Sequence, residues 1–151
     1  MRSLIISVLP LVLGACVSGA GEQPPAPLAR DREQPVLALF EHVLTGYFAT
    51  HGANAPTTCA ALRPGPLSAE QEEALIVRFV RLAPASRCVA GVYAITGEPA
   101  SVVEVYAFTC ASPELCSGWA TSSSSEATRY AMRFEDGQWH FTADLRRIAG
   151  Q

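Results

Sequence analysis

The spacing of apolar residues predicts that the folded part of this chain begins with helices and continues with strands. From residue 35 to residue 50, apolar side chains recur at steps of three and four, while Glu41 and Thr45 fall on the other side. The apolar positions are Val36, Phe40, Val43, Leu44, Tyr47 and Phe48. Pro35 suits the first helical position because that position needs no N–H donor. We therefore expect an amphipathic helix from Pro35 to about Thr50.

A second helix is expected to begin at Ser68. Ser68 and Gln71 have the spacing of a capping box, in which each side chain bonds the backbone N–H of the other residue. The apolar stripe predicted for this helix is Leu75, Ile76, Phe79, Val80 and Leu82. Pro84 disfavours helical geometry at the residue before it, so the helix is expected to end there.

The remainder of the chain has the composition of β-strands. Residues 89–96 and 101–111 are rich in Val, Tyr, Ile and Phe, and a Gly-Glu-Pro-Ala segment separates them. Residues 116–121 form a shorter candidate strand. The final strands are predicted to be a hairpin, because Asp136-Gly137 is a strong two-residue turn signal.

The register of this hairpin follows from its turn. One face would pair Phe134 with Trp139, Met132 with Phe141, Tyr130 with Ala143 and Thr128 with Leu145. The other face would pair Arg133 with His140 and Arg129 with Asp144. A slip of one residue would mix the apolar and polar faces, so the pattern specifies this register.

The N-terminal residues have the order of an export signal. Arg2 precedes an apolar run from Leu4 to Leu13, which at ten residues is shorter than the roughly 20 that a membrane-spanning helix needs. The run closes with Leu13-Gly14-Ala15-Cys16, which resembles the lipobox of bacterial lipoproteins. This resemblance implies removal of residues 1–15 and lipidation of Cys16, and several acyl chains on one terminus anchor a protein stably. The alternative is an ordinary signal peptide that leaves Cys16 as an incidental thiol.

The same resemblance implies a location. Val17 follows the cysteine where Gram-negative inner-membrane lipoproteins carry Asp, which implies the outer membrane, with the domain facing the periplasm. Residues 16–34 would then form a disordered, proline-rich tether, because Pro24, Pro25 and Pro27 favour extended geometry. The eighteen residues after Cys16, 17–34, reach about 60 Å when extended. Residues 35–151 are left as one domain.

Charge and cysteine content narrow the alternatives. Without residues 1–15 the chain has ten arginines, no lysine and fourteen acidic residues, a net charge of −4. An acidic chain without a basic cluster argues against a nucleic-acid partner. The four cysteines beyond Cys16 predict two disulfides, with three connectivities open. Cys110 and Cys116 flank a short loop between strands and can face each other, which leaves Cys59 for Cys88.

The order of elements and the final hairpin, Phe134-Glu135-Asp136-Gly137-Gln138-Trp139-His140-Phe141, together resemble NTF2-like (cystatin-like α+β roll) domains. The resemblance implies an α+β fold in which two N-terminal helices pack on a curved antiparallel sheet of about four to five strands. The cone of such a roll either holds a ligand or is filled with side chains. The superfamily includes enzymes, carriers and protein-binding modules, so the fold fixes no activity. The two disulfides are additional to its pattern.

Candidate chemistry is sparse. His42, His51 and His140 are scattered, there is no nucleophile-elbow motif or C-x-x-C pair, and no histidine lies near a cysteine. We therefore predict no catalytic residue, no metal site and no cofactor. Tyrosine and tryptophan combine an apolar body with a polar tip, and five of them are candidates for lining a ligand pocket. These are Tyr47, Tyr106, Trp119, Tyr130 and Trp139.

These features favour a membrane-anchored, periplasm-facing lipoprotein that acts as a non-catalytic binding or structural module, with an envelope protein as partner. One alternative is a small-molecule-binding or enzymatic domain with an open cone, for which the ligand is unknown. A third is an inhibitor or immunity-like protein against an envelope enzyme. A cavity with Tyr106, Trp119 or Tyr130 at its wall would favour the ligand hypothesis, whereas a filled cone with an exposed apolar patch would favour a protein partner. Catalysis would require a titratable side chain facing the cavity with a shifted pKa.

Overall fold

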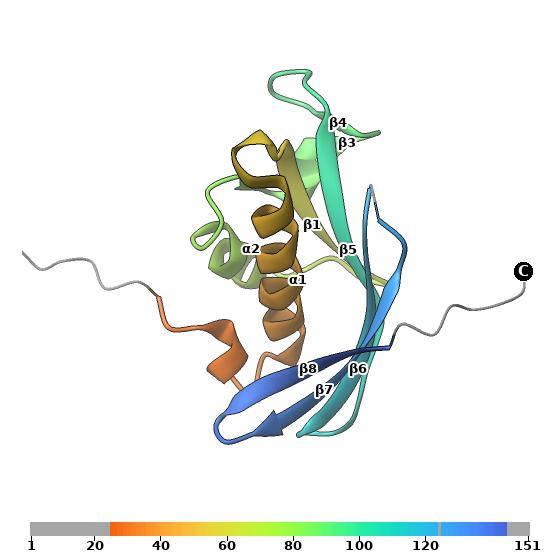
Figure 1. Cartoon of the computed structure of the whole chain (residues 1–151). Coiled ribbons are helices and arrows are strands. Elements are labelled where there is room, and N and C mark those ends of the chain that lie inside the picture. Colours follow the sequence, from red (N-terminus) through yellow and green to blue (C-terminus); the bar gives the residue numbers. More distant parts are fainter. Residues whose placement is uncertain (1–24, 124, 145–151) are drawn as a thin grey trace, which may run out of the picture.

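The computed structural model describes residues 25–123 and 125–144 (Figure 1). The predicted signal peptide, the lipobox with Cys16, and the expected pairing of Thr128 with Leu145 lie outside these residues. The helices and strands are, in chain order, α1 (Pro35–His51), β1 (Thr57–Arg63), α2 (Ala69–Ile76), β2 (Leu82–Ala83), β3 (Cys88–Val89), β4 (Val92–Tyr93), β5 (Ala100–Ser112), β6 (Leu115–Ser122), β7 (Thr128–Glu135) and β8 (Gln138–Asp144). Short 3-10 helices occupy Leu28–Arg30, Gly52–Asn54 and Ala85–Arg87.

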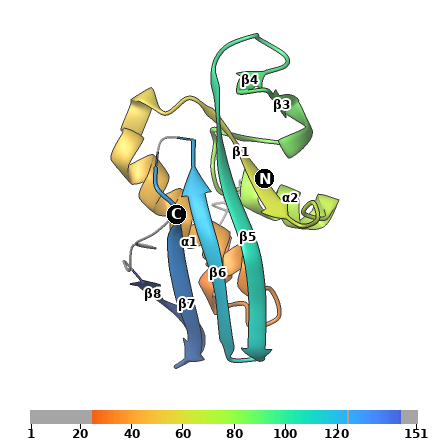
Figure 2. The same ribbon diagram turned by 90° about the vertical axis from the view of Figure 1, so that its right-hand side faces the viewer.

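Two helices and a large sheet confirm the α+β class, but the sheet differs from the expected one. It has six strands in the order β2-β1-β5-β6-β7-β8, where about four to five were predicted. It is also mixed, because β1 runs parallel to both β2 and β5, whereas β5 to β8 form an antiparallel meander. The sheet curves around α1 (Figure 1), and Figure 2 shows its outer face.

The sequence pattern does not predict strand β1, because its residues, TTCAALR, are mostly small and do not alternate clearly between apolar and polar side chains. Thr58 and Ala60 are buried on the face toward α1, opposite Ser101 and Val103 of β5. The pairing with β5 extends over seven residue pairs, so backbone hydrogen bonds rather than large side chains hold β1 in place.

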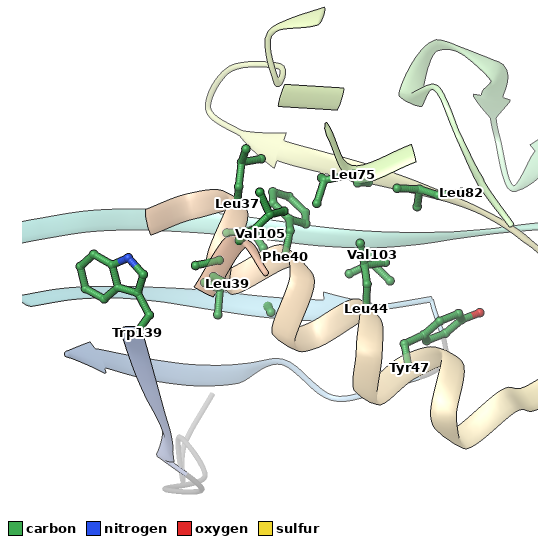
Figure 3. Close-up of a cluster of buried hydrophobic side chains, with 14 of the residues drawn as sticks. Leu37, Leu39, Phe40, Leu44, Tyr47, Leu75, Leu82, Val103, Val105 and Trp139 are labelled. Carbon is green, nitrogen blue, oxygen red and sulfur yellow. The ribbon is translucent and has the colours of Figure 1, made fainter. Parts of the chain in front are cut away.

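The core lies between α1 and the sheet. Leu39, Phe40 and Leu44 of α1 are completely buried, as are Val103 and Val105 of β5 (Figure 3). Leu75 of α2 and Leu82 of β2 close the core at the β1 side of the sheet. The predicted first helix is therefore confirmed, with its end at His51.

The second helix is confirmed at its start and wrong at its end. Ser68 and Gln71 form both bonds of the capping box, but the helix ends at Ile76, well before Pro84. Val80 is fully exposed, so it does not belong to the predicted buried stripe. Leu82 reaches the core because it extends as β2 and pairs with Thr58 of β1. Tertiary pairing thus overrides the helical periodicity of this segment.

Where one strand was predicted over residues 89–96, the structure has a short hairpin, β3–β4, whose two strands have two residues each. Ala90 and Gly91 form its turn with φ of 50° and 79°, the geometry of a type I′ connection. An alanine with positive φ is uncommon, and for that reason the sequence gives little sign of the turn. The hairpin lies at the end of the sheet where β5 begins (Figures 1 and 2).

The final hairpin has the predicted register. Phe134 pairs with Trp139, Met132 with Phe141, and Tyr130 with Ala143. Arg133–His140 and Arg129–Asp144 lie on the opposite face, and the turn residues Asp136 and Gly137 have φ of 52° and 75°. Both disulfides are also present: Cys110–Cys116 joins paired residues of β5 and β6, and Cys59–Cys88 ties the β3–β4 hairpin to β1.

The segment before α1 packs on the domain. Leu28 is buried, and the indole Nε1 of Trp139 donates a hydrogen bond of 2.9 Å to the carbonyl oxygen of Asp31. Arg32 forms a 2.7 Å ion pair with Glu114, and Arg78 donates to the carbonyl of Ala26. Residues 25–34 thus belong to the fold rather than to the tether predicted for residues 16–34. The reason is that a buried indole N–H needs an acceptor, and this segment supplies it.

Candidate functional site

An open cavity of about 910 Å³ lies between α1 and the inner face of strands β6, β7 and β8. It follows α1 from Ala38 to His51, a distance of about 20 Å at 1.5 Å per residue. The sheet contributes Ala120, Thr121 and Ser122 from β6, Thr128 and Tyr130 from β7, and Phe141 from β8. The cavity exists because small residues face it from both sides, where α1 and β6 would otherwise fill the space with side chains.

Three aromatic rings cluster at one part of the cavity wall. The imidazole of His42 stacks on the ring of Phe141, with centroids 4.3 Å apart and planes 8° apart. The ring of Tyr130 meets the same imidazole edge-on at 5.4 Å. These rings come from α1, β8 and β7. The hairpin register places Tyr130 and Phe141 on the inner face, so it is what builds the cluster.

His42 is solvent-exposed and Tyr130 is half-buried, so the rings of this cluster are only partly desolvated. This partial desolvation lowers the pKa of His42 below the ordinary histidine value, and it raises the pKa of the Tyr130 phenol. Both groups are therefore uncharged at neutral pH. Within the described part of the chain, neither ring nitrogen of His42 has a hydrogen-bond partner. A neutral imidazole carries one donor and one acceptor, and both are free to bind a ligand in the cavity.

The opposite part of the cavity is rich in hydroxyl groups. The hydroxyl groups of Ser122 and Ser125 are hydrogen-bonded to each other, with their oxygens 2.8 Å apart. The Thr121 hydroxyl donates to the carbonyl oxygen of Ser125 at 3.0 Å. His51 stacks on Tyr47 at 4.2 Å, and its Nδ1 lies 2.9 Å from the Tyr47 carbonyl oxygen. The cavity thus has one part formed by the rings of His42, Tyr130 and Phe141, and another part that combines hydroxyl groups with the Tyr47–His51 pair.

Glu41 also borders the cavity, but its charge is compensated. One carboxylate oxygen lies 2.9 Å from Nη1 of Arg78, and the other accepts the backbone N–H of Ala29 at 3.0 Å. Both side chains of the ion pair are largely buried, at 14% and 17% exposure. The pair joins α1 to the segment after α2, so Glu41 is a structural residue here.

Of the five aromatic residues predicted to line a pocket, the structure brings Tyr47 and Tyr130 to the cavity. Tyr106 and Trp119 lie on the outer face of the sheet, where their rings stack with centroids 6.3 Å apart. Trp139 is buried in the core and bonded to Asp31. Those three assignments are wrong because alternation along β5 and β6 directs Tyr106 and Trp119 outward, and Trp139 packs under residues 25–34.

His42 was not among the residues predicted to line a pocket, but it lies in the cavity wall. Its position one helical turn after Ala38 and before Gly46 places all three on one face of α1. In the sequence, the available signal of an unfilled space was a small residue one helical turn before the histidine, Ala38, and another one turn after it, Gly46. A second hollow, of about 470 Å³, lies on the outer side of the β6–β8 region, and its lining combines charged side chains such as Arg133 and Glu135 with apolar ones such as Leu115.

No helix of the described residues is long and apolar enough to cross a membrane. Among residues 25–123 and 125–144, no three His, Cys, Asp or Glu side chains come together where they could hold a metal ion. Comparisons with protein-family models, with curated proteins and with solved structures find no match for this chain.

Proposed function

We propose that this chain is a lipid-anchored protein of the bacterial cell envelope whose domain binds a small molecule without transforming it. The observation that carries the binding site is the cavity between α1 and strands β6–β8, with the neutral side chains of His42 and Tyr130 at its wall. Concave sites with an apolar lining and a few converging polar groups are the usual form of ligand pockets. The anchor rests on the lipobox-like Leu13-Gly14-Ala15-Cys16.

The arrangement of elements supports an NTF2-like roll. In such a roll a long helix lies against a curved antiparallel meander, and α1 with β5–β8 has this form. The cavity lies where the cone of a roll would be. Strand β1, helix α2, strand β2 and the β3–β4 hairpin are inserted between the helix and the meander.

Binding is favoured over catalysis by the surroundings of His42. A histidine acting as general base is usually oriented by a carboxylate or carbonyl bonded to its second nitrogen. The described residues give His42 no such partner, and Glu41 is held by Arg78 and Ala29. The imidazole is therefore suited to bonding a ligand rather than to moving its proton.

The test is native mass spectrometry of the full chain exported with Cys16→Ser, which removes the proposed lipidation site. A bound small molecule that is absent from the denatured spectrum supports the proposal. The wild-type chain labelled with a palmitate analogue tests the anchor, because the label should appear on the wild type and be lost in Cys16→Ser. Labelling of both chains would contradict lipidation at Cys16.

A protein partner is a second candidate, favoured by the β3–β4 hairpin. Val89 and Val92 face each other across it, and both are exposed, as is Ile95 beyond it. Cys88 and Tyr93 occupy the other face, and Cys88 is tied to β1, so the valines point away from the domain. A photo-crosslinking amino acid at position 95 tests this candidate in cells. One discrete adduct in the envelope fraction supports a partner. The same photo-crosslinking amino acid placed at position 142, on the outer face of the sheet, serves as control.

A further inference from the structure

We propose that the cavity selects a ligand without negative charge: an apolar, ring-containing body with an uncharged hydrogen-bonding group. This inference rests on the proposed function, since it assumes that the cavity is the ligand site. It concerns the class of molecule that fits there, and it comes from the charge, shape and hydrogen-bonding capacity of the wall.

Among the described residues, the wall has no arginine or lysine that could neutralise an anion. No described residue that lines the cavity is an arginine, and the chain has no lysine. The two carboxylates at the cavity are Glu41, which Arg78 already neutralises, and Glu126, which is exposed at the rim. Thr50 and His51 line the cavity in the last turn of α1, where the helix dipole places partial negative charge. An anion would therefore lose hydration and gain no ion pair.

The shape of the wall suits a ring-containing body. The flat His42–Phe141 stack and the edge of Tyr130 form one side. Gly46 lines the cavity one helical turn after His42 on the same face of α1, and a Cβ placed there would meet no atom within 4 Å. Glycine inside a helix costs about 0.5–1 kcal/mol relative to alanine, so this position gives up stability and leaves space at the cavity.

The polar groups of the wall are suited to an uncharged partner. The imidazole of His42 and the phenol of Tyr130 are neutral and supply both donors and an acceptor. The hydroxyls of Thr121, Ser122 and Ser125 are largely bonded to one another and to backbone. The ring cluster is therefore where a neutral hydroxyl, amide or carbonyl of the ligand finds unused partners.

Two fluorescent probes test charge selection with a matched body. N-phenyl-1-naphthylamine is uncharged, and 8-anilino-1-naphthalenesulfonate is the same body carrying one sulfonate. Each is titrated into the full chain with Cys16→Ser at pH 7.5. We expect saturable binding of the neutral probe and at least about tenfold weaker binding of the sulfonate, a difference of one decade in Kd.

Substitutions locate the binding. Gly46→Leu fills the cavity from α1 and Thr128→Leu fills it from β7, so each should weaken binding of the neutral probe about tenfold or more. Ala131→Leu, on the opposite face of β7 and beside the outer hollow, is the matched control and should leave it unchanged. Circular dichroism of each variant identifies any that fails to fold, and two independent blocking variants keep the test valid if one does.

The outcomes separate the two claims. Equal binding of both probes that is lost in the blocking variants would overturn the charge selection and leave the cavity as the ligand site. Binding of neither probe, or binding that only Ala131→Leu removes, would overturn the proposed site as well. Selective binding of the neutral probe that both blocking variants weaken supports both.

Discussion

The imidazole of His42 lies parallel to the ring of Phe141, with the two ring centroids 4.3 Å apart. The two residues are far apart in the chain, one on the first helix and one on the last strand. Their contact closes the curved sheet onto α1 and forms one wall of the cavity. A stacked aromatic pair contributes about 0.5–1.5 kcal/mol beyond its buried area, so the same contact shapes the site and supports the fold.

The lowered pKa of His42 predicts a loss of stability in mild acid. The unfolded chain protonates His42 near pH 6.5, whereas partial desolvation against the cavity wall holds its folded-state pKa lower. The contribution of His42 to the free energy of unfolding is therefore constant above about pH 6.5. It becomes progressively destabilising as the pH falls through the interval between the unfolded-state and folded-state pKa values. His42→Phe keeps a stacking ring and removes the titration. Urea unfolding at pH 7.5 and pH 5 should show a smaller acid loss in His42→Phe than in the wild type. An equal loss would contradict the lowered pKa of His42.

Two glycines should respond oppositely to alanine. A Cβ at Gly118 would lie 2.9 Å from Cδ2 of Phe108 and 3.2 Å from Cδ2 of Leu39, so the core must shift, at a cost of about 1–3 kcal/mol. Gly46→Ala has open space and a gain in helix propensity, which predicts stabilisation of about 0.5–1 kcal/mol. Urea unfolding of both variants measures these changes. Destabilisation by Gly46→Ala would mean that the cavity wall is already filled at this position.

Trp139 is expected to anchor the segment before α1. Trp139→Phe removes the donor to the Asp31 carbonyl and part of a buried ring, which should cost about 1–3 kcal/mol. Hydrogen exchange should show faster exchange at the amide of Ala29, which donates to the Glu41 carboxylate of α1, and at the amide of Asp31, which donates to the Leu28 carbonyl. Trp119→Phe on the outer face is the control and should change stability by about 0.5 kcal/mol or less. Unchanged exchange in Trp139→Phe would show that the segment is held by other contacts.

The two disulfides should contribute unequally. Cys59–Cys88 closes a segment with a sequence separation of 29, and Cys110–Cys116 one of 6. Chain-entropy arguments give about 3.6 kcal/mol for the longer loop and about 2.2 kcal/mol for the shorter. Removing each pair by double alanine substitution and measuring unfolding in urea tests the order. A larger loss from Cys110 and Cys116 would mean that strain or packing, not loop closure, dominates.

The parts of this fold that the sequence predicts are those with strong local patterns. The α1 periodicity, the capping box at Ser68 and the Asp136-Gly137 turn each have one geometry that satisfies them, and the structure has all three. Strand β1 and the end of α2 depend instead on pairing between segments. No local pattern signals that Leu82 leaves a helical repeat to pair with Thr58.

The same distinction applies to the site. Alternation in β7 correctly predicts that Tyr130 faces inward, since the hairpin register follows from its turn. The positions of Tyr106 and Trp119 depend on which face of β5 and β6 meets α1, and both faces carry apolar residues. His42 is part of the site only because its ring contacts Tyr130 and Phe141, which lie about 90 and about 100 positions further along the chain.

The most direct test of the proposed binding site is a ¹H–¹⁵N correlation titration of the Cys16→Ser chain with N-phenyl-1-naphthylamine. The account predicts saturable shifts that are largest at the amides of Gly46, Ser122 and Tyr130, around the cavity. Amides of the outer face, such as those of Trp119 and Ala131, should move least. Saturable shifts centred on the outer face or on the β3–β4 hairpin, with the cavity amides unmoved, would contradict the account.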